Sequence, residues 1–230
     1  MRWSAVVATT LAGALVLTLL LPLQHAPQAL QIGAAAVTLL VGVIVGNLAC
    51  PGRSVAAPLA VAAQAGCSSL VLLALLGWSD GAATFGSLLR SALAVAVLAW
   101  VMSALVQLFA RQERRHASVS LVAFATLVLG LAPLWGGAIV DAVAPTGAGA
   151  DILVGVSPLT YLAQAAGWDY LRYDWIYRVT PLGSLRFDYP DFWISTIAYA
   201  ALAAALQVLA AGIRQSVSAG LGSAPPTAVT

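Results

Sequence analysis

The sequence predicts an all-α, polytopic membrane protein with six transmembrane helices and short outer interfacial or re-entrant helices between the fifth and the sixth. Three observations support this fold class. Of the 230 residues, 61% are hydrophobic and only 8% are charged, the mean hydropathy is +0.95, and the apolar residues fall into six long stretches. Soluble domains carry about 25% charged residues. This composition therefore excludes a cytosolic enzyme, a nucleic-acid-binding protein and a disordered chain.

A helix needs about 20 apolar residues to cross the roughly 30 Å hydrocarbon core, because each residue rises about 1.5 Å. Six stretches meet this requirement, and together they indicate one transmembrane domain over residues 1–214 and a polar cytoplasmic tail over 215–230. The predicted spans are residues 4–23, 30–50, 55–78, 85–109, 119–143 and 192–213.

The first stretch begins like a secretory signal, because Arg2 precedes an apolar run. The run of about 18 residues exceeds the usual 7–15, and no cleavage site of small residues follows it. We therefore expect this stretch to be retained as the first span.

Arginine placement predicts the orientation, because positively charged loops stay in the cytoplasm. With the N-terminus inside, the cytoplasmic side carries six arginines and one acid, Glu113, whereas the outer side carries four arginines and all seven aspartates. The six inner cations are Arg2, Arg53, Arg111, Arg114, Arg115 and Arg214. We predict an integral protein of the bacterial cytoplasmic membrane with both termini in the cytoplasm.

Motifs for catalysis and for cofactor or metal binding are lacking in the sequence. His25 and His116 lie in no metal-binding pattern, Cys50 and Cys67 form no CxxC pair, and no Walker-type phosphate loop is present. No acid lies at the centre of a span, where transporters that move protons or ions usually place one. We expect no enzymatic activity, cofactor or metal, and no nucleic-acid partner.

Small residues and a proline mark expected helix contacts. Gly42 and Gly46 have the GxxxG spacing that lets two helix backbones approach closely, either within the bundle or as a dimer face. Pro133 removes a backbone hydrogen bond from the fifth span and should kink it.

The connection between the fourth and fifth spans is a short basic cluster. Its charged residues are Arg111, Glu113, Arg114 and Arg115. The cluster is either an ordinary positive anchor or a contact site for a cytoplasmic partner or anionic lipid heads.

The outer segment between the last two spans, residues 145–190, begins a helix near its middle. Ser157 can cap the free amides of that helix, Pro158 suits its first position, and Gly167 interrupts it. Ten of the 18 aromatic residues fall between Tyr161 and Trp193. The segment should therefore lie at the membrane surface or dip into it.

Beyond Gly167, helical spacing places Trp168 and Trp175 on one face, while Asp174 and Arg178 form a favourable i,i+4 pair on another. Three interpretations fit this segment: an aromatic belt that sets the depth of the bundle, a lid over an outward-facing path, or a docking face for an external partner.

Six spans, a basic fourth connection and an outer segment with short helices together resemble the permease subunit of ABC-2-type ABC transporters. Residues 111–118 look like the second coupling loop of that family, and residues 156–162 look like its Asn/Ser-Pro-Leu stretch. The resemblance covers residues 98–214. It implies one half of a dimeric permease that works with a separate ATP-binding subunit on a lipid-like or small hydrophobic substrate.

The resemblance also implies roles for the residues already named. The movement that nucleotide binding causes in the ATP-binding subunit would be transmitted to Arg111, Glu113, Arg114 and Arg115. Pro133 would let the fifth span flex, and residues 157–178 would close the outer side.

A second function remains open, because the connection between the second and third spans is only Pro51–Ser54, which gives an ATPase little to contact. In that alternative the chain is a non-catalytic accessory subunit of a larger membrane complex. Both readings predict contact with membrane lipids and a homo- or hetero-oligomer.

Overall fold

The computed structural model describes residues 27–49, 56–80, 84–109, 115–136, 148–172 and 188–221, and all regular secondary structure within these ranges is helical. The helices are α2 (Pro27–Ala49), α3 (Ala57–Asp80), α4 (Phe85–Phe109), α5 (Arg115–Gly130), α6 (Ala132–Trp135), α8 (Ala148–Val156), α9 (Pro158–Ala166), the 3₁₀ turn η3 (Tyr170–Arg172) and α11 (Phe192–Leu221).

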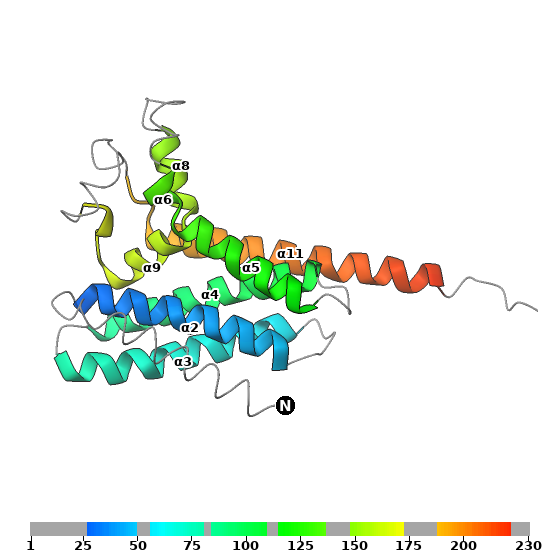
Figure 1. The fold of residues 1–230 in the computed structure, drawn as a ribbon, viewed down its shortest axis with the longest axis horizontal. Coiled ribbons are helices and arrows are strands. Elements are labelled where there is room, and N and C mark those ends of the chain that lie inside the picture. Colours follow the sequence, from blue (N-terminus) through cyan, green and yellow to red (C-terminus); the bar gives the residue numbers. More distant parts are fainter. Residues whose placement is uncertain are drawn as a thin grey trace, which may run out of the picture.

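Helices α2, α3, α4, α5 and α11 run side by side along the long axis, whereas α6 and α8 stand steeply to them at one end (Figure 1). Helix α4 is central, because it packs against α2, α3, α5, α9 and α11. Helix α9 lies over the end at which α2, α4 and α11 begin. We call this the α9 end of the bundle, and the end at which α4 finishes and α5 begins the opposite end.

Four described helices are long and apolar enough to cross a membrane, which supports a multi-pass membrane protein. They correspond to the predicted second, third, fourth and sixth spans and cover Leu30–Leu48, Ala57–Leu75, Phe85–Phe109 and Phe192–Ser216. The predicted first span, residues 4–23, lies outside the described residues, as does most of the tail at 215–230.

The predicted fifth span, residues 119–143, is not one continuous helix where the structure describes it. The 16-residue α5 ends at Gly130, and the four-residue α6 follows only after Leu131. Alone, α5 is shorter than the length needed to span the hydrocarbon core. Residues 137–143 lie outside the described part of the chain.

Small side chains set the spacing between α2, α3 and α4. A Cβ on Gly46 would come within 2.7 Å of Val61 Cγ1, and one on Gly66 within 2.9 Å of Ala96 Cβ. A Cβ on Gly42 would similarly approach Ala65 Cβ to 3.0 Å. The GxxxG face of α2 is therefore occupied by α3 of the same chain, so the predicted close helix contact exists, but it lies within the bundle and not at a dimer face.

Two buried polar pairs join helices inside the bundle. Gln31 Nε2 donates to Ser91 Oγ at 3.0 Å, and Asn47 Nδ2 donates to Ser103 Oγ at 3.0 Å, so both pairs connect α2 to α4. Buried amides and hydroxyls are stable in such an interior because each is paired with the other. These pairs fix the register of α2 against α4 over most of their length.

Candidate functional site: a broken helix and a buried tyrosine cluster

The break between α5 and α6 is a direct consequence of Pro133. Proline has no backbone N–H, and its ring collides with the carbonyl four residues earlier, so a regular helix cannot pass through it. Leu131 N still bonds to Leu127 O at 3.0 Å, but Leu134 N bonds to Leu131 O at 2.9 Å and leaves the Gly130 carbonyl without its helical donor. The predicted kink at Pro133 is thus a helix end followed by a single new turn.

Side chains replace the donors that the break removes. Ser157 Oγ donates to Gly130 O at 2.9 Å, and Trp135 Nε1 donates to Val128 O at 3.1 Å. Unpaired backbone groups cost several kcal/mol in a bilayer, and a broken helix survives there only if neighbouring groups satisfy its backbone. Ser157 therefore ties the end of α5 to the beginning of α9.

Ser157 has a second role as the N-cap of α9. Its Oγ accepts the Thr160 backbone N–H at 3.3 Å, and Pro158 occupies the first helical position. Gly167 ends the helix in the left-handed conformation at φ 71°, with Trp168 N bonded to Ala163 O at 2.9 Å. The helix start and stop predicted from the sequence are both confirmed.

Tyr161 is the centre of an aromatic cluster between α9 and α11. Its side chain is only 2% exposed and stacks on Phe192 with ring centroids 5.5 Å apart, while the Tyr199 ring lies 5.1 Å away. The Tyr161 hydroxyl shares a 2.7 Å hydrogen bond with Thr196 Oγ1, and Tyr199 Oη donates to Val156 O at 2.8 Å. These two bonds connect the start of α11 to α9 through Tyr161 and to the end of α8 through Tyr199.

A second tyrosine layer continues from this cluster toward the surface. The Tyr170 hydroxyl bonds to Thr160 Oγ1 at 3.0 Å, and Tyr189 Oη donates to Asp169 Oδ1 at 2.5 Å. Asp169 also pairs with Arg172 at 3.4 Å between Oδ2 and Nε. Side-chain hydroxyl groups are therefore found all the way from the helix break at Gly130 to the charged pair Asp169–Arg172 at the surface.

Burial changes the acidity of these tyrosines. Removal from water raises the pKa of Tyr161 and of Tyr170 to about 12, against the opposing effect of their hydroxyl hydrogen bonds. Burial also raises the pKa of Tyr189, and both the hydrogen bond to Asp169 and the negative charge of that carboxylate add to the increase. All three groups are therefore neutral hydrogen-bonding groups at physiological pH.

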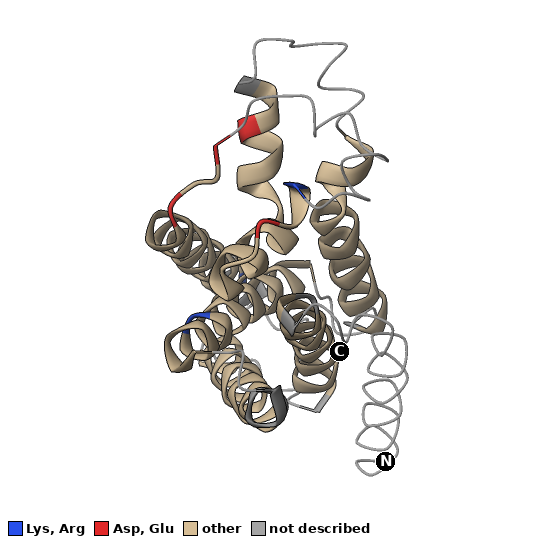
Figure 2. Cartoon of the chain, turned by 90° about the vertical axis from the view of Figure 1, so that its left-hand side faces the viewer, with Lys and Arg blue, Asp and Glu red and all other residues tan. Residues whose placement is uncertain are grey.

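Acidic residues gather at the α9 end. Figure 2 shows the aspartates of the described residues around α8 and the start of α11, with few cations among them. Asp191 caps α11 by accepting Trp193 N at 2.8 Å and Ile194 N at 3.3 Å, and Asp151 accepts Asp188 N at 3.0 Å. Asp191 is thus placed as expected for an anion at a helix N-terminus, whereas Asp151 joins α8 to the segment that precedes α11.

The structure brings together four residues of the predicted outer site: Ser157, Pro158, Tyr161 and Trp168. The remaining three, Asp174, Trp175 and Arg178, lie outside the described residues. The same holds for the basic cluster residues Arg111, Glu113 and Arg114, whereas Arg115 is the first residue of α5.

Sequence reasoning missed the contribution of the last span to this cluster. Phe192, Thr196 and Tyr199 follow one another at intervals of four and three residues, which places them on one helix face. A polar and aromatic face on an otherwise apolar span was the signal available. Within the described residues, no group of three or more His, Cys, Asp or Glu side chains could hold a metal ion.

The sequence matches no family model and no curated protein, and the structure matches no solved structure.

Proposed function

We propose that the chain is the transmembrane subunit of an ATP-driven transporter of the ABC-2 type, which moves a lipid-like or small hydrophobic substrate and takes its energy from a separate ATP-binding subunit. The observation that carries this proposal is the Ser157–Gly130 hydrogen bond, which joins a broken α5 to two short helices that precede the last span in the chain. This order of elements is the one that the resemblance to ABC-2 permeases implies.

The arrangement suits transmission of movement along α5. Helix α5 begins at Arg115, the last residue of the basic cluster of residues 111–115, and ends at the break beside α9. A movement of the ATP-binding subunit against the basic cluster would tilt α5. Because the helix is broken at Leu131, α5 could tilt without moving α6 as part of the same rigid body. Ser157 would pass the displacement to α8 and α9, which would open or close the outer side as re-entrant helices.

The proposal is tested by identifying the proteins that bind the chain in its native membrane. Affinity purification of the full chain from its native membrane, followed by mass spectrometry, should recover an ATP-binding subunit and vanadate-sensitive ATPase activity. Replacing Arg111, Glu113 and Arg114 by Ala should lower recovery of that subunit at least tenfold. Arg90→Ala is the matched control, because Arg90 is exposed on α4 at the other end of the bundle. A homogeneous preparation with no ATP-binding subunit and no ATP-dependent phenotype would reject the proposal.

One observation favours the accessory-subunit alternative. Only 17% of the apolar window of α11 is buried within the chain, against 61% for α4, and large side chains such as Trp193, Ile197 and Val208 are exposed along it. A neighbouring subunit could cover this face. Recovery of a stable multi-subunit complex without an ATPase in the same purification would support this alternative.

A further inference from the structure

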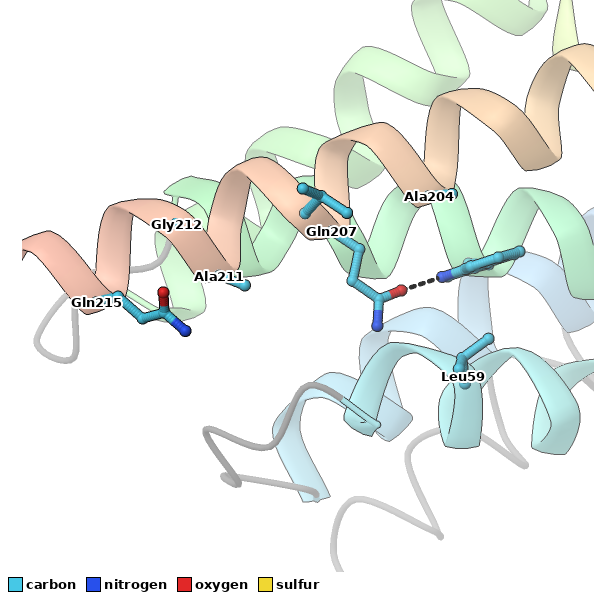
Figure 3. A pocket seen from close by; sticks show the side chains of 8 residues that line it. Leu59, Ala204, Gln207, Ala211, Gly212 and Gln215 are labelled. Atoms are coloured by element: carbon cyan, nitrogen blue, oxygen red, sulfur yellow. Dashed lines mark hydrogen bonds between the residues drawn. The ribbon is translucent and has the colours of Figure 1, made fainter.

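A groove opens on the side of the bundle between α3, α4 and α11, away from the tyrosine cluster. Its volume is about 460 Å³, within the range of about 300–1,000 Å³ typical of small-molecule sites. Leu59 of α3 and Trp100 of α4 form two walls, and α11 forms the third (Figure 3). The α11 residues that line it are Ala204, Gln207, Val208, Ala211, Gly212 and Gln215.

Small side chains on α11 create the space. Ala204, Ala211 and Gly212 face the groove, and a Cβ on Gly212 would meet nothing within 4 Å. Leu59 and Val208 at the rim are 46% and 73% exposed. The groove therefore has apolar walls and is open along the flank of a membrane-spanning bundle.

The polar side chains that line the groove, those of Trp100, Gln207 and Gln215, belong to residues that already have interaction partners. Trp100 Nε1 donates to Gln207 Oε1 at 2.6 Å, which joins α4 to α11 across the floor (Figure 3). A polar solute would need several converging donors and acceptors, whereas a hydrocarbon chain needs only the apolar walls.

A cation lies beside the groove. Arg214 stands between the lining residues Gly212 and Gln215 on α11 without lining the groove itself, and its guanidinium donates to Gln107 O of α4 at 3.4 Å. Among the residues whose side chains the structure describes, Arg214 is the charged residue at the opposite end of the bundle, and no carboxylate lies there. Charge at this end therefore favours an anion.

We infer that the groove binds one acyl chain of an anionic phospholipid, with the phosphate of its headgroup at Arg214. Basic sites between transmembrane helices bind anionic lipid headgroups, and the apolar walls supply the matching surface for the chain. A second copy of this chain is a poorer occupant, because a two-fold contact through this face would place the Arg214 cations of both copies beside the contact, with no carboxylate among the described residues of that end to pair with them. The inference does not depend on the proposed transport function.

Trp100 offers an intrinsic probe, because bromine atoms on a lipid chain quench indole fluorescence on contact. The full chain with its other six tryptophans replaced by Phe would be placed in phosphatidylcholine vesicles. These would contain a small fraction of brominated phosphatidylglycerol or, separately, the same fraction of brominated phosphatidylcholine. Association of the anionic lipid should be stronger by about fivefold, the effect expected of one basic residue near the surface. The wild-type signal minus that of Trp100→Phe gives the same measure without the six replacements.

Variants then distinguish quenching by lipid bound in the groove from quenching by lipid of the surrounding bilayer. Ala204→Leu with Gly212→Leu should fill the groove and abolish the preferential quenching. Ala201→Leu with Ala205→Leu should not, since those residues are exposed on the same helix but do not line the groove. Arg214→Gln should remove the preference for the anionic lipid while quenching by the acyl chain persists.

Three outcomes would overturn the inference. Equal quenching by the two brominated lipids would show bulk lipid only, and preferential quenching that survives the groove-filling variant would place the lipid elsewhere. Absence of quenching would mean that another segment or chain covers the groove. If the filled variant does not fold, Arg214→Gln decides the question, because a preference unchanged by that substitution contradicts the inference.

Discussion

At the α9 end of the bundle, hydroxyl and aromatic side chains from α9, α11 and η3 bond to one another around a helix break, whereas at the opposite end the helices pack through small side chains and are joined by isolated polar pairs such as Trp100–Gln207 and Asn47–Ser103. This difference between the two ends is caused by the conformation of the backbone at each end. The α9 end contains a helix break and two short helices, whose free carbonyls and amides need partners, and Ser157 and Tyr199 provide hydroxyls to bond them. The opposite end has continuous helices whose backbone groups are already paired, so close contacts such as that of Gly46 with Val61 and a few side-chain pairs such as Asn47–Ser103 hold them together.

The largest effect is expected at the centre of the tyrosine cluster. Tyr161→Ala removes a buried ring that stacks on Phe192 and contacts Tyr199, and large aromatic truncations cost about 3–5 kcal/mol. Tyr161→Phe keeps the ring and loses only the bond to Thr196, which costs about 1 kcal/mol. Reversible unfolding in mixed micelles measures both. Equal costs for the two variants would show that the ring packing contributes nothing.

A smaller effect of a different kind is expected at the opposite end. Gly46→Ala places a methyl group 2.7 Å from the stiff Val61 side chain, and overpacking of this sort costs about 1–3 kcal/mol. Gly86→Ala is the control, because nothing lies within 4 Å of its added Cβ, so it should be neutral or stabilising by up to about 1 kcal/mol. The same micelle unfolding assay compares them. A Gly46→Ala chain as stable as Gly86→Ala would refute close packing of α2 on α3.

The hydrogen bond between Trp100 and Gln207 should contribute less. Gln207→Leu removes the acceptor of the Trp100 indole N–H, and hydrogen bonds between membrane helices average about 0.6 kcal/mol with a maximum near 1.7. Trp100 fluorescence should also shift when its N–H loses the 2.6 Å bond. A loss as large as that of Tyr161→Ala would remove the proposed contrast between the two ends.

The pH dependence should appear only above pH 10. The pKa of Tyr161 and Tyr170 is about 12 in the folded chain and 10.0 without the fold, so the folded state holds protons that the unfolded state releases between these values. Their contribution to stability is therefore complete below pH 10 and is lost as the pH rises toward 12. Phenolate absorbance should rise at lower pH in unfolded chain than in folded chain. Superimposable titrations would contradict the burial of these hydroxyls.

Local signals in the sequence were sufficient for much of the fold. Long apolar runs predicted the helices that became α2, α3, α4 and α11, because length and hydropathy alone decide whether a helix suits a bilayer. Ser157, Pro158 and Gly167 predicted the bounds of α9 for an equally local reason, since capping depends on residues within one turn.

The sequence could not reveal contacts between distant segments. Nothing near Gly130 indicates that its carbonyl is bonded by a serine 27 residues later. The GxxxG spacing also did not indicate that α3 covers Gly42 and Gly46. The same spacing occurs in helix contacts within one chain and in contacts between two chains. The hydropathy of the fifth span also gave no sign of the break in α5, because Leu131 and Trp135 are as apolar as the helix around them.

A double-mutant cycle between Pro133 and Ser157 tests most directly whether the serine hydroxyl compensates for the broken helix. Ser157→Ala should cost about 1–3 kcal/mol in the wild-type chain, because the Gly130 carbonyl loses its donor and α9 loses its cap. In the Pro133→Ala background the helix can continue and Leu134 N can return to Gly130 O, so the same substitution should cost roughly half as much or less. Equal costs of Ser157→Ala in the two backgrounds would contradict the account.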